Sequence, residues 1–348
     1  MSRAGYDTLR WGPVSLRWRR RSAALGVILA VAVVVLGCLS LAHGTYPLSL
    51  DRVVAALTGD GARVERYTVF ELRMPRTVTG IVVGFALGLS GALTQTVTRN
   101  PIASPDILGV SAGASLGAVT VITLGSSTAV STLGVPGAAL AGGLLTAGVI
   151  FALSWKRGSD TFRLILMGIA VNAFLIALTS WLLVSARLSR AVEANVWLLG
   201  SLDASAWPSL GPTLAGVAVL AAAAVASSRV LRALSFGEDT ASALGIRVAP
   251  ARLLLLLLSV GLAALSVAVA GPIGFVAFAA PQLALRLART ASPPLVSAGL
   301  LGAVLVTGGD LVIRVFSPIP LPVGIVTTAI GGCLLIALIV RVNLRRSA

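Results

Sequence analysis

The sequence predicts an all-α polytopic membrane protein of about ten transmembrane helices. Of its 348 residues, 57% are hydrophobic and only 11% are charged, whereas soluble domains carry about 25% charged residues. Apolar runs of roughly 20 residues, the length that a helix needs to cross a bilayer, recur along the chain. Arginines stand between these runs, as expected where charges set the orientation of a chain in a membrane.

Each expected helix is an apolar run of spanning length or slightly shorter. The first run follows RWRRRS and is longer than the apolar core of a cleavable signal peptide, so we expect it to be retained. Proline and glycine interrupt the chain in RNPIASPDILG and in GPIGFVAFAAPQ, and broken helices are common near the moving parts of transporters. The expected spans are residues 22–42, 75–97, 107–124, 131–154, 162–185, 209–228, 252–271, 273–288, 295–315 and 322–340.

The positive residues predict which side of the membrane each connection faces. With both termini in the cytoplasm, all but eight of the 27 lysine and arginine residues lie on the inner side, as the positive-inside rule requires. We therefore expect a cytoplasmic segment over residues 1–21, a single transmembrane domain over 22–340 and a cytoplasmic tail over 341–348. The outer residues are Arg52, Arg63, Arg66, Arg73, Arg76, Arg187, Arg190 and Arg314.

Three of the outer arginines stand at expected helix ends. Arg73 and Arg76 bracket a proline in ELRMPR before the second span, and Arg314 ends the ninth span in DLVIRVFSPIP. Either these side chains snorkel to lipid headgroups, or they form a docking surface for acidic residues of a soluble partner. A guanidinium binds a carboxylate through two parallel hydrogen bonds, which suits it to the second role.

Composition excludes several classes of function. Lys156, the only lysine, lies in LSWKRG without the glycine frame of a Walker A loop, so any ATP must be bound by another subunit. Cys38 and Cys333 fall inside apolar runs and His43 is the only histidine, so we expect neither a disulfide nor a metal site. The net charge of +15 is divided among separate connections, and without a continuous basic face we expect no nucleic-acid partner.

Small and polar residues within the spans have two interpretations. Gly80, Gly84 and Gly88 recur every four residues along one stripe of the second span, where absent side chains let another helix approach closely. Helix packing is the expected role of this stripe, and a place along the transport pathway is the alternative. Three amide side chains have the same ambiguity, and they are Gln95, Asn100 and Asn172.

The long inner connection SSRVLRALSFGEDTASALGIRVAPAR contains a helical signal. Gly237 precedes Glu238, Asp239 and Thr240, and carboxylates near the positive end of a helix dipole favour a helix start. Gly245 favours the end of that helix. The short cytoplasmic helix is either part of a solvated loop or a lever on which a cytosolic subunit pushes.

Seven motifs follow one another along the chain: ELRMPR at 71–76, GLSGALTQTVTRNPIASPDILGVSAGA at 88–114, VWLLGSL at 196–202, GEDTASALG at 237–245, GPIGFVAFAAPQ at 271–282, GGDLVIR at 308–314 and LPVGIVTTAIGG at 321–332. In order and spacing they resemble the FecCD-type permeases of binding-protein-dependent ABC importers for iron-siderophores, haem and vitamin B12. The resemblance covers roughly residues 46–341. Many relatives read PHIAR where this chain has PQLALR at 281–286, so we assign that turn no role.

The resemblance implies a type II importer assembled from several chains. Two permease subunits of ten helices each, more often a heterodimer with a paralogue than a homodimer, enclose a pathway through the bacterial cytoplasmic membrane. Two cytosolic ABC ATPase subunits use ATP and magnesium, and an extracytoplasmic siderophore-binding protein delivers the substrate. On this resemblance the chain itself binds no cofactor and catalyses no reaction.

The resemblance also implies roles for three sets of residues. Docking of the binding protein matches Arg73, Arg76 and Arg314. A cytoplasmic gate matches the polar turn of Asp160, Thr161, Phe162 and Arg163. Coupling to the ATPase matches Phe236, Gly237, Glu238, Asp239, Thr240, Ala241, Leu244 and Gly245.

Two stretches, GSDTFRLILMGI and GEDTASALGI, are most similar to permeases for ferric catecholate siderophores of the enterobactin type. We therefore expect this chain to translocate such a siderophore. Haem or vitamin B12 import is the alternative within the family. An ion-coupled secondary transporter is the alternative outside it, but such a protein needs intramembrane carboxylates, and only Asp310 lies deep in an expected span.

Overall fold

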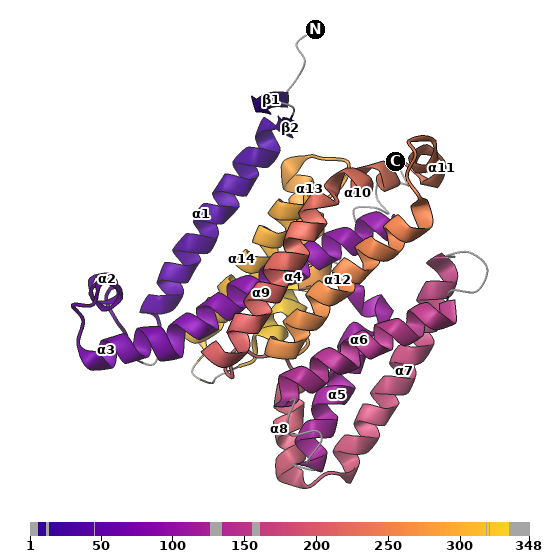
Figure 1. The fold of residues 1–348 in the computed structure, drawn as a ribbon. Coiled ribbons are helices and arrows are strands. Elements are labelled where there is room, and N and C mark those ends of the chain that lie inside the picture. The colour runs from indigo at the N-terminus through magenta and orange to yellow at the C-terminus, as the bar shows by residue number, and fades with distance from the viewer. Residues whose placement is uncertain are drawn as a thin grey trace.

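The computed structural model describes residues 6–11, 14–44, 46–125, 134–154, 161–317, 319 and 321–333. Within them the chain is a bundle of helices preceded by a small hairpin, in which β1 (Tyr6–Trp11) pairs antiparallel with β2 (Val14–Arg19). The hairpin leads directly into α1 (Arg20–Ala42), as Figure 1 shows. The all-α architecture is confirmed, and the hairpin is an addition that we did not predict. The expected tail at 341–348 lies outside the described residues.

Seven helices among the described residues are long and apolar enough to cross a membrane, and three shorter apolar helices fall where the other expected spans lie. This agreement confirms a multi-pass membrane architecture. The seven are α1, the continuous helix Arg63–Thr98 made of α3 (Arg63–Tyr67), η1 (Thr68–Arg73) and α4 (Met74–Thr98), α6 (Gly134–Ser154), α7 (Thr161–Ser185), α9 (Trp207–Ala226), α12 (Val248–Ala270) and α14 (Leu295–Phe316). The three are α5 (Val110–Leu124), α13 (Val276–Ala288) and Val323–Cys333.

The central helix of the bundle is α4, which packs against α14, α12 and α13 and is buried along most of its length. A side chain on Gly84 would collide with the backbone of Gly302, and one on Gly88 would collide with the backbone of Ala298. A side chain on Gly80 would instead meet the side chains of Leu202 and of Thr307 in α14, without a backbone collision. The backbones of α4 and α14 therefore meet directly, as small residues allow in membrane helix pairs. Gly84 and Gly88 thus make close helix contacts, and whether the stripe also borders a pathway stays a prediction.

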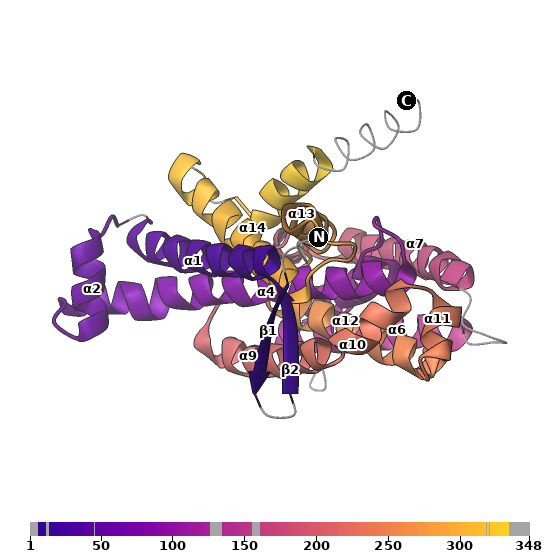
Figure 2. The same cartoon turned by 90° about the horizontal axis from the view of Figure 1, so that it is seen from above.

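The remaining helices lie on two flanks of this centre. The helices α5, α6 and α7 pack together on one flank with α8 (Leu188–Leu198), and α1 lies on the other flank against α14, as Figures 1 and 2 show. The outer surface of α7 is apolar and exposed, with Phe174 66% and Trp181 62% accessible in this single chain. Such a surface is covered either by lipid or by another membrane subunit.

Short helices stand at both ends of the long helix Arg63–Thr98. At its start, α2 (Leu50–Thr58) packs with α3 and η1 around a small apolar cluster that includes Val53, Ala56 and Val69. Near its end lie α10 (Ser228–Ser235) and α11 (Glu238–Ala243). Figure 1 shows the two groups at opposite ends of the bundle. The arginines expected outside and the lever expected inside are thus joined by one helix.

Candidate functional site

The first functional residue, Arg73, closes the end of α1. Its Nη1 donates hydrogen bonds to the carbonyl oxygens of Leu41 at 2.7 Å and Ala42 at 2.9 Å, and its Nη2 donates to that of Tyr46. The last carbonyls of a helix have no partner within the helix, and a cation is favoured beside them. Arg73 is only 6% exposed. In this structure its guanidinium therefore binds the carbonyl oxygens that have no helical partner at the end of α1.

The second residue, Arg76, forms a fork on the carboxylate of Asp310. Its Nη2 lies 2.7 Å from Oδ1 of Asp310, and its Nε lies 3.0 and 3.2 Å from Oδ1 and Oδ2. Its Nη1 forms an ion pair with Asp203, on the loop between α8 and α9. The Arg76 side chain is 20% exposed and that of Asp203 is 49% exposed. The Nη1 of Arg76 therefore lies toward the surface, whereas its Nε and Nη2 lie against the buried Asp310.

The third residue, Arg314, shares the same aspartate. Its Nη2 lies 2.8 Å from Oδ2 of Asp310, one helical turn earlier in α14. Its Nη1 donates to the carbonyl oxygens of Ser40 at 3.1 Å and His43 at 3.2 Å. Asp310 is therefore held between two guanidinium groups, with only 3% of its side chain exposed. A buried carboxylate requires such partners, because an unpaired charge in an apolar interior is costly.

These contacts bring the three expected docking arginines together around the end of α1 and Asp310. Each of the three is already bonded within the chain, and Arg73 has almost no accessible surface. Their role in docking remains a prediction. Asp203 as a partner of Arg76 was not predicted, because several acidic residues lie in the expected outer connections and the sequence does not say which of them pairs with which arginine.

The expected inner helix is present as α11, bounded by two glycines with positive φ, Gly237 at +116° and Gly245 at +81°. Ala241 anchors it in the core, whereas Phe236 is 75% and Leu244 66% exposed. Two apolar side chains therefore project from the surface beside this helix, at the end of the bundle opposite the arginine cluster (Figure 1). Asp239 and Thr240 are exposed on the same helix.

Glu238 connects α11 to both of the long helices beside it. Its Oε1 lies 3.5 Å from Nη2 of Arg99, which follows α4, and it also pairs with Arg252 near the start of α12. Arg99 has a left-handed backbone with φ of +50°. A displacement of α11 would therefore pull on Arg99 at the end of α4 and on Arg252 near the start of α12. Whether an ATPase uses this connection stays a prediction.

The expected gate turn is described only in part. Asp160 lies outside the described residues, and Thr161, Phe162 and Arg163 form the first turn of α7.

Two of the three amide side chains singled out in the sequence, those of Asn100 and Asn172, bond to nearby backbone groups. Asn100 accepts a hydrogen bond from the Ile102 amide at 3.0 Å, and Asn172 donates to the carbonyl of Asp106 at 3.0 Å. These two side chains hold local turns and neighbouring elements in this structure.

Gln95 takes part in a buried link between α4 and α13. Its Nε2 donates to the carbonyl of Phe278 at 3.1 Å, and its Oε1 accepts from Nε2 of Gln282 at 2.7 Å. Both amide side chains are buried, and these hydrogen bonds give their polar groups partners across the contact between α4 and α13. Gln282 belongs to the turn to which we assigned no role, and its contact with Gln95 was not predictable from a single sequence.

The comparisons with known proteins agree along most of the chain. The FecCD transport family matches residues 32–341. The ferric enterobactin transport system permease protein FepG of Escherichia coli is 40% identical, with 92% of this chain and 97% of FepG covered. FepD of the same system and organism is 36% identical over 92% of this chain and 98% of its own length.

A cobalamin import permease, BtuC of Halobacterium salinarum, is 40% identical over 75% of this chain and 70% of its own length. Among solved structures, a metal-chelate type ABC transporter in an inward-facing conformation matches with a TM-score of 0.82 and 30% identity. The match covers 92% of this chain and 99% of that one. The fold, the motifs and these matches agree, and the chain belongs to the FecCD transport family of ABC importer permeases.

Proposed function

We propose that this chain is the permease subunit through which a bacterial ABC importer moves a ferric siderophore of the catecholate type across the cytoplasmic membrane. The observation that carries the proposal is the similarity to FepG, which extends over 92% of this chain. The chain supplies a passage and docking sites and performs no covalent chemistry. ATP and magnesium are used by two cytosolic ATPase subunits.

In this proposal each end of the helix Arg63–Thr98 meets one partner. The cluster of Arg73, Arg76 and Arg314 at one end receives acidic residues of an extracytoplasmic siderophore-binding protein. The exposed apolar side chains of Phe236 and Leu244 at the other end fit a pocket on an ATPase subunit. Both termini then lie in the cytoplasm, as the distribution of arginine indicates.

A second permease subunit covers the exposed apolar surface of α7. The exposed apolar side chains of this surface include Phe174, Trp181 and Val184. FepG and FepD are two permease proteins of one transport system, which supports a heterodimer with a paralogue. Copurification of differently tagged copies of this chain tests the point, because a homodimer would carry both tags.

Transport follows from closure of the ATPase subunits. Closure displaces α11, and the ion pairs of Glu238 with Arg99 and Arg252 transmit the movement to α4 and α12. The long helix then changes the opening of the pathway at its outer end. Ion-coupled transport is not supported, because Asp310, the carboxylate expected deep in a span, is already paired with both Arg76 and Arg314.

Uptake of labelled iron in cells that lack this gene tests the function. The iron is presented as a ferric catecholate, as a ferric hydroxamate and as haem, and labelled cobalamin is measured in parallel. We expect uptake to be lost for the catecholate alone and restored by the wild-type gene. Loss of cobalamin uptake instead would support the cargo named for the Halobacterium relative.

A pair of variants tests the arginine cluster in the same cells, with the membrane level of each variant measured alongside uptake so that loss of folding is distinguished from loss of docking. Arg76→Glu with Arg314→Glu reverses the cluster and is expected to abolish uptake. Arg229→Glu with Arg232→Glu makes the same change in charge at exposed positions of the inner end and serves as the matched control. Normal uptake with the first pair would remove this cluster from the mechanism. Uptake that persists without the ATPase subunits would remove the ABC mechanism itself.

A further inference from the structure

The helix that carries ELRMPR continues well beyond the end of α1. Arg73 contacts the last carbonyls of α1, so the residues before Arg73 stand beyond the point where α1 ends. Arg66 precedes Arg73 by seven residues, which is about 10 Å at ~1.5 Å of helix rise per residue. The segment Arg63–Arg73 and α2 therefore form a cap that projects past the end of the first membrane helix.

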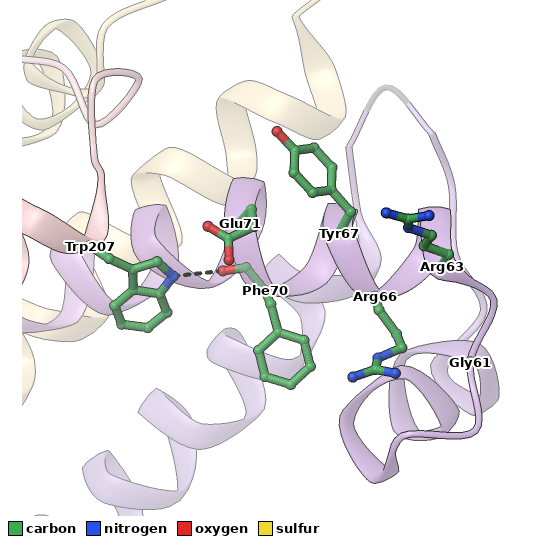
Figure 3. A pocket seen from close by; sticks show the side chains of 7 residues that line it. All are labelled: Gly61, Arg63, Arg66, Tyr67, Phe70, Glu71 and Trp207. Atoms are coloured by element: carbon green, nitrogen blue, oxygen red, sulfur yellow. Dashed lines mark hydrogen bonds between the residues drawn. The ribbon is translucent and has the colours of Figure 1, made fainter.

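An open pocket of about 830 Å³ lies on this cap, next to the start of α9 (Figure 3). Its charged and aromatic lining consists of Arg63, Arg66, Tyr67, Phe70, Glu71 and Trp207. The Nε1 of Trp207 donates a hydrogen bond of 2.9 Å to the carbonyl of Phe70, which fixes α9 against the cap. The rings remain accessible, with Tyr67 59% and Trp207 39% exposed.

The arginines of this pocket differ from the three beside it. Arg63 and Arg66 are exposed and form no ion pair with any described residue, whereas Arg73, Arg76 and Arg314 are bonded within the chain. Glu71 is the pocket's only acidic residue, so the lining keeps a positive charge. Arginine, tyrosine and tryptophan are also the residues that most often anchor protein interfaces.

We propose that this pocket receives an acidic segment of the extracytoplasmic binding protein that also presents an apolar or aromatic side chain. The inference rests on the proposed function and moves the first contact of docking outward, from the bonded arginines to Arg63 and Arg66. Carboxylates of the partner pair with these two guanidinium groups, and its apolar side chain packs on Tyr67, Phe70 and Trp207. A lipid headgroup is the less suitable occupant, because the pocket stands beyond the end of α1.

Site-specific photo-crosslinking in living cells tests the proposal. Tyr67 is replaced by the photoreactive analogue p-benzoylphenylalanine in the full-length chain, expressed with the complete importer, and crosslinked peptides are identified by mass spectrometry. We expect an acidic surface segment of a solute-binding protein. In the chain that carries the photoreactive residue at position 67, Arg63→Glu with Arg66→Glu should reduce the crosslinked fraction roughly fivefold. The reason is that two exposed ion pairs with the partner become repulsive contacts.

Two further variants complete the test, one expected to increase the crosslinked fraction and one expected to leave it unchanged. Glu71→Gln removes the one opposing charge and should increase the crosslinked fraction, an effect that loss of folding cannot mimic. Arg229→Glu with Arg232→Glu changes the net charge equally at the inner end and should leave crosslinking unchanged. If the double glutamate variant fails to reach the membrane, Arg63→Gln with Arg66→Gln replaces it.

Each other outcome overturns the proposal. Crosslinks to lipid alone would assign the pocket to the membrane, and crosslinks to no binding protein would leave no docking partner there. Equal crosslinking by the charge-reversed variant would exclude recognition by charge. Siderophore uptake in the same cells keeps the two hypotheses apart, since normal uptake without the crosslink refutes the pocket and leaves the transport function standing.

Discussion

Asp310 lies between two arginines, with its Oδ1 2.7 Å from Nη2 of Arg76 and its Oδ2 2.8 Å from Nη2 of Arg314. This arrangement joins α4 to α14 at the end where both helices leave the core. Arg73 and Arg314 also bond the end of α1. Three helices thus meet at one buried carboxylate, which explains why arginines stand at these helix ends.

Removal of that carboxylate should destabilise the protein strongly. Asp310→Ala leaves two guanidinium groups partly buried without their shared partner, and breaking a buried ion pair in this way costs about 3–5 kcal/mol. The measurement is the thermal unfolding midpoint of the purified chain in detergent. Asp203→Ala is the matched control, because Asp203 is half exposed and its loss should cost about 1 kcal/mol or less. Equal midpoints for the two variants would contradict this account.

Asp203 should compete with an acidic partner for Arg76. It pairs with the exposed arm of Arg76, and Ser201 Oγ holds it in place by a hydrogen bond of 2.8 Å to its Oδ2. Asp203→Asn keeps the shape and removes the competing charge, so binding of the soluble binding protein should tighten about twofold to fivefold at low salt. Surface plasmon resonance on the importer in nanodiscs measures the effect. Weaker binding would mean that Asp203 positions Arg76 for the partner.

The exposed apolar side chains at the inner end should couple the permease to its ATPase. Phe236→Ala with Leu244→Ala removes two side chains that touch little within the chain, so stability should change by no more than about 0.5 kcal/mol. Copurification of the ATPase subunits should fall, and uptake should fall with it. Ser242→Ala, at an exposed position of α11 outside the residues matched to coupling, is the control. Full retention of the ATPase by the double variant would place the coupling surface elsewhere.

Close helix packing should make Gly91 intolerant of any side chain. A Cβ at Gly91 would overlap the carbonyl oxygen of Ala277 in α13, whereas a Cβ at Gly148 in α6 would meet no atom within 4 Å. Gly91→Ala should therefore lower stability by about 1–3 kcal/mol through overpacking. Gly148→Ala is the matched control and should be neutral or slightly stabilising in a helix. Thermal unfolding of the two variants side by side decides the matter.

Much of the architecture was predictable because it depends on local sequence. The positions of the spans follow from apolar runs, although the second helix begins at Arg63 and not at residue 75. The short helix α11 follows from the pattern of Gly237, acidic residues and Gly245. The hairpin of β1 and β2 was not predicted, because it depends on the pairing of two short strands, for which this arginine-rich segment gives no clear signal. The glycine stripe indicated a close helix approach, but it did not identify α14 as the neighbour.

The sequence by itself determined the fold class, the places of the apolar runs and the unusual arginines of ELRMPR. Only the tertiary structure decided what those arginines contact. Arg76 and Asp310 are separated by 234 positions, and Arg73 reaches carbonyls more than 25 positions earlier. The physical reason is that the backbone hydrogen bonds of a membrane helix form within one segment, whereas the pairing of buried charges requires several segments to pack together.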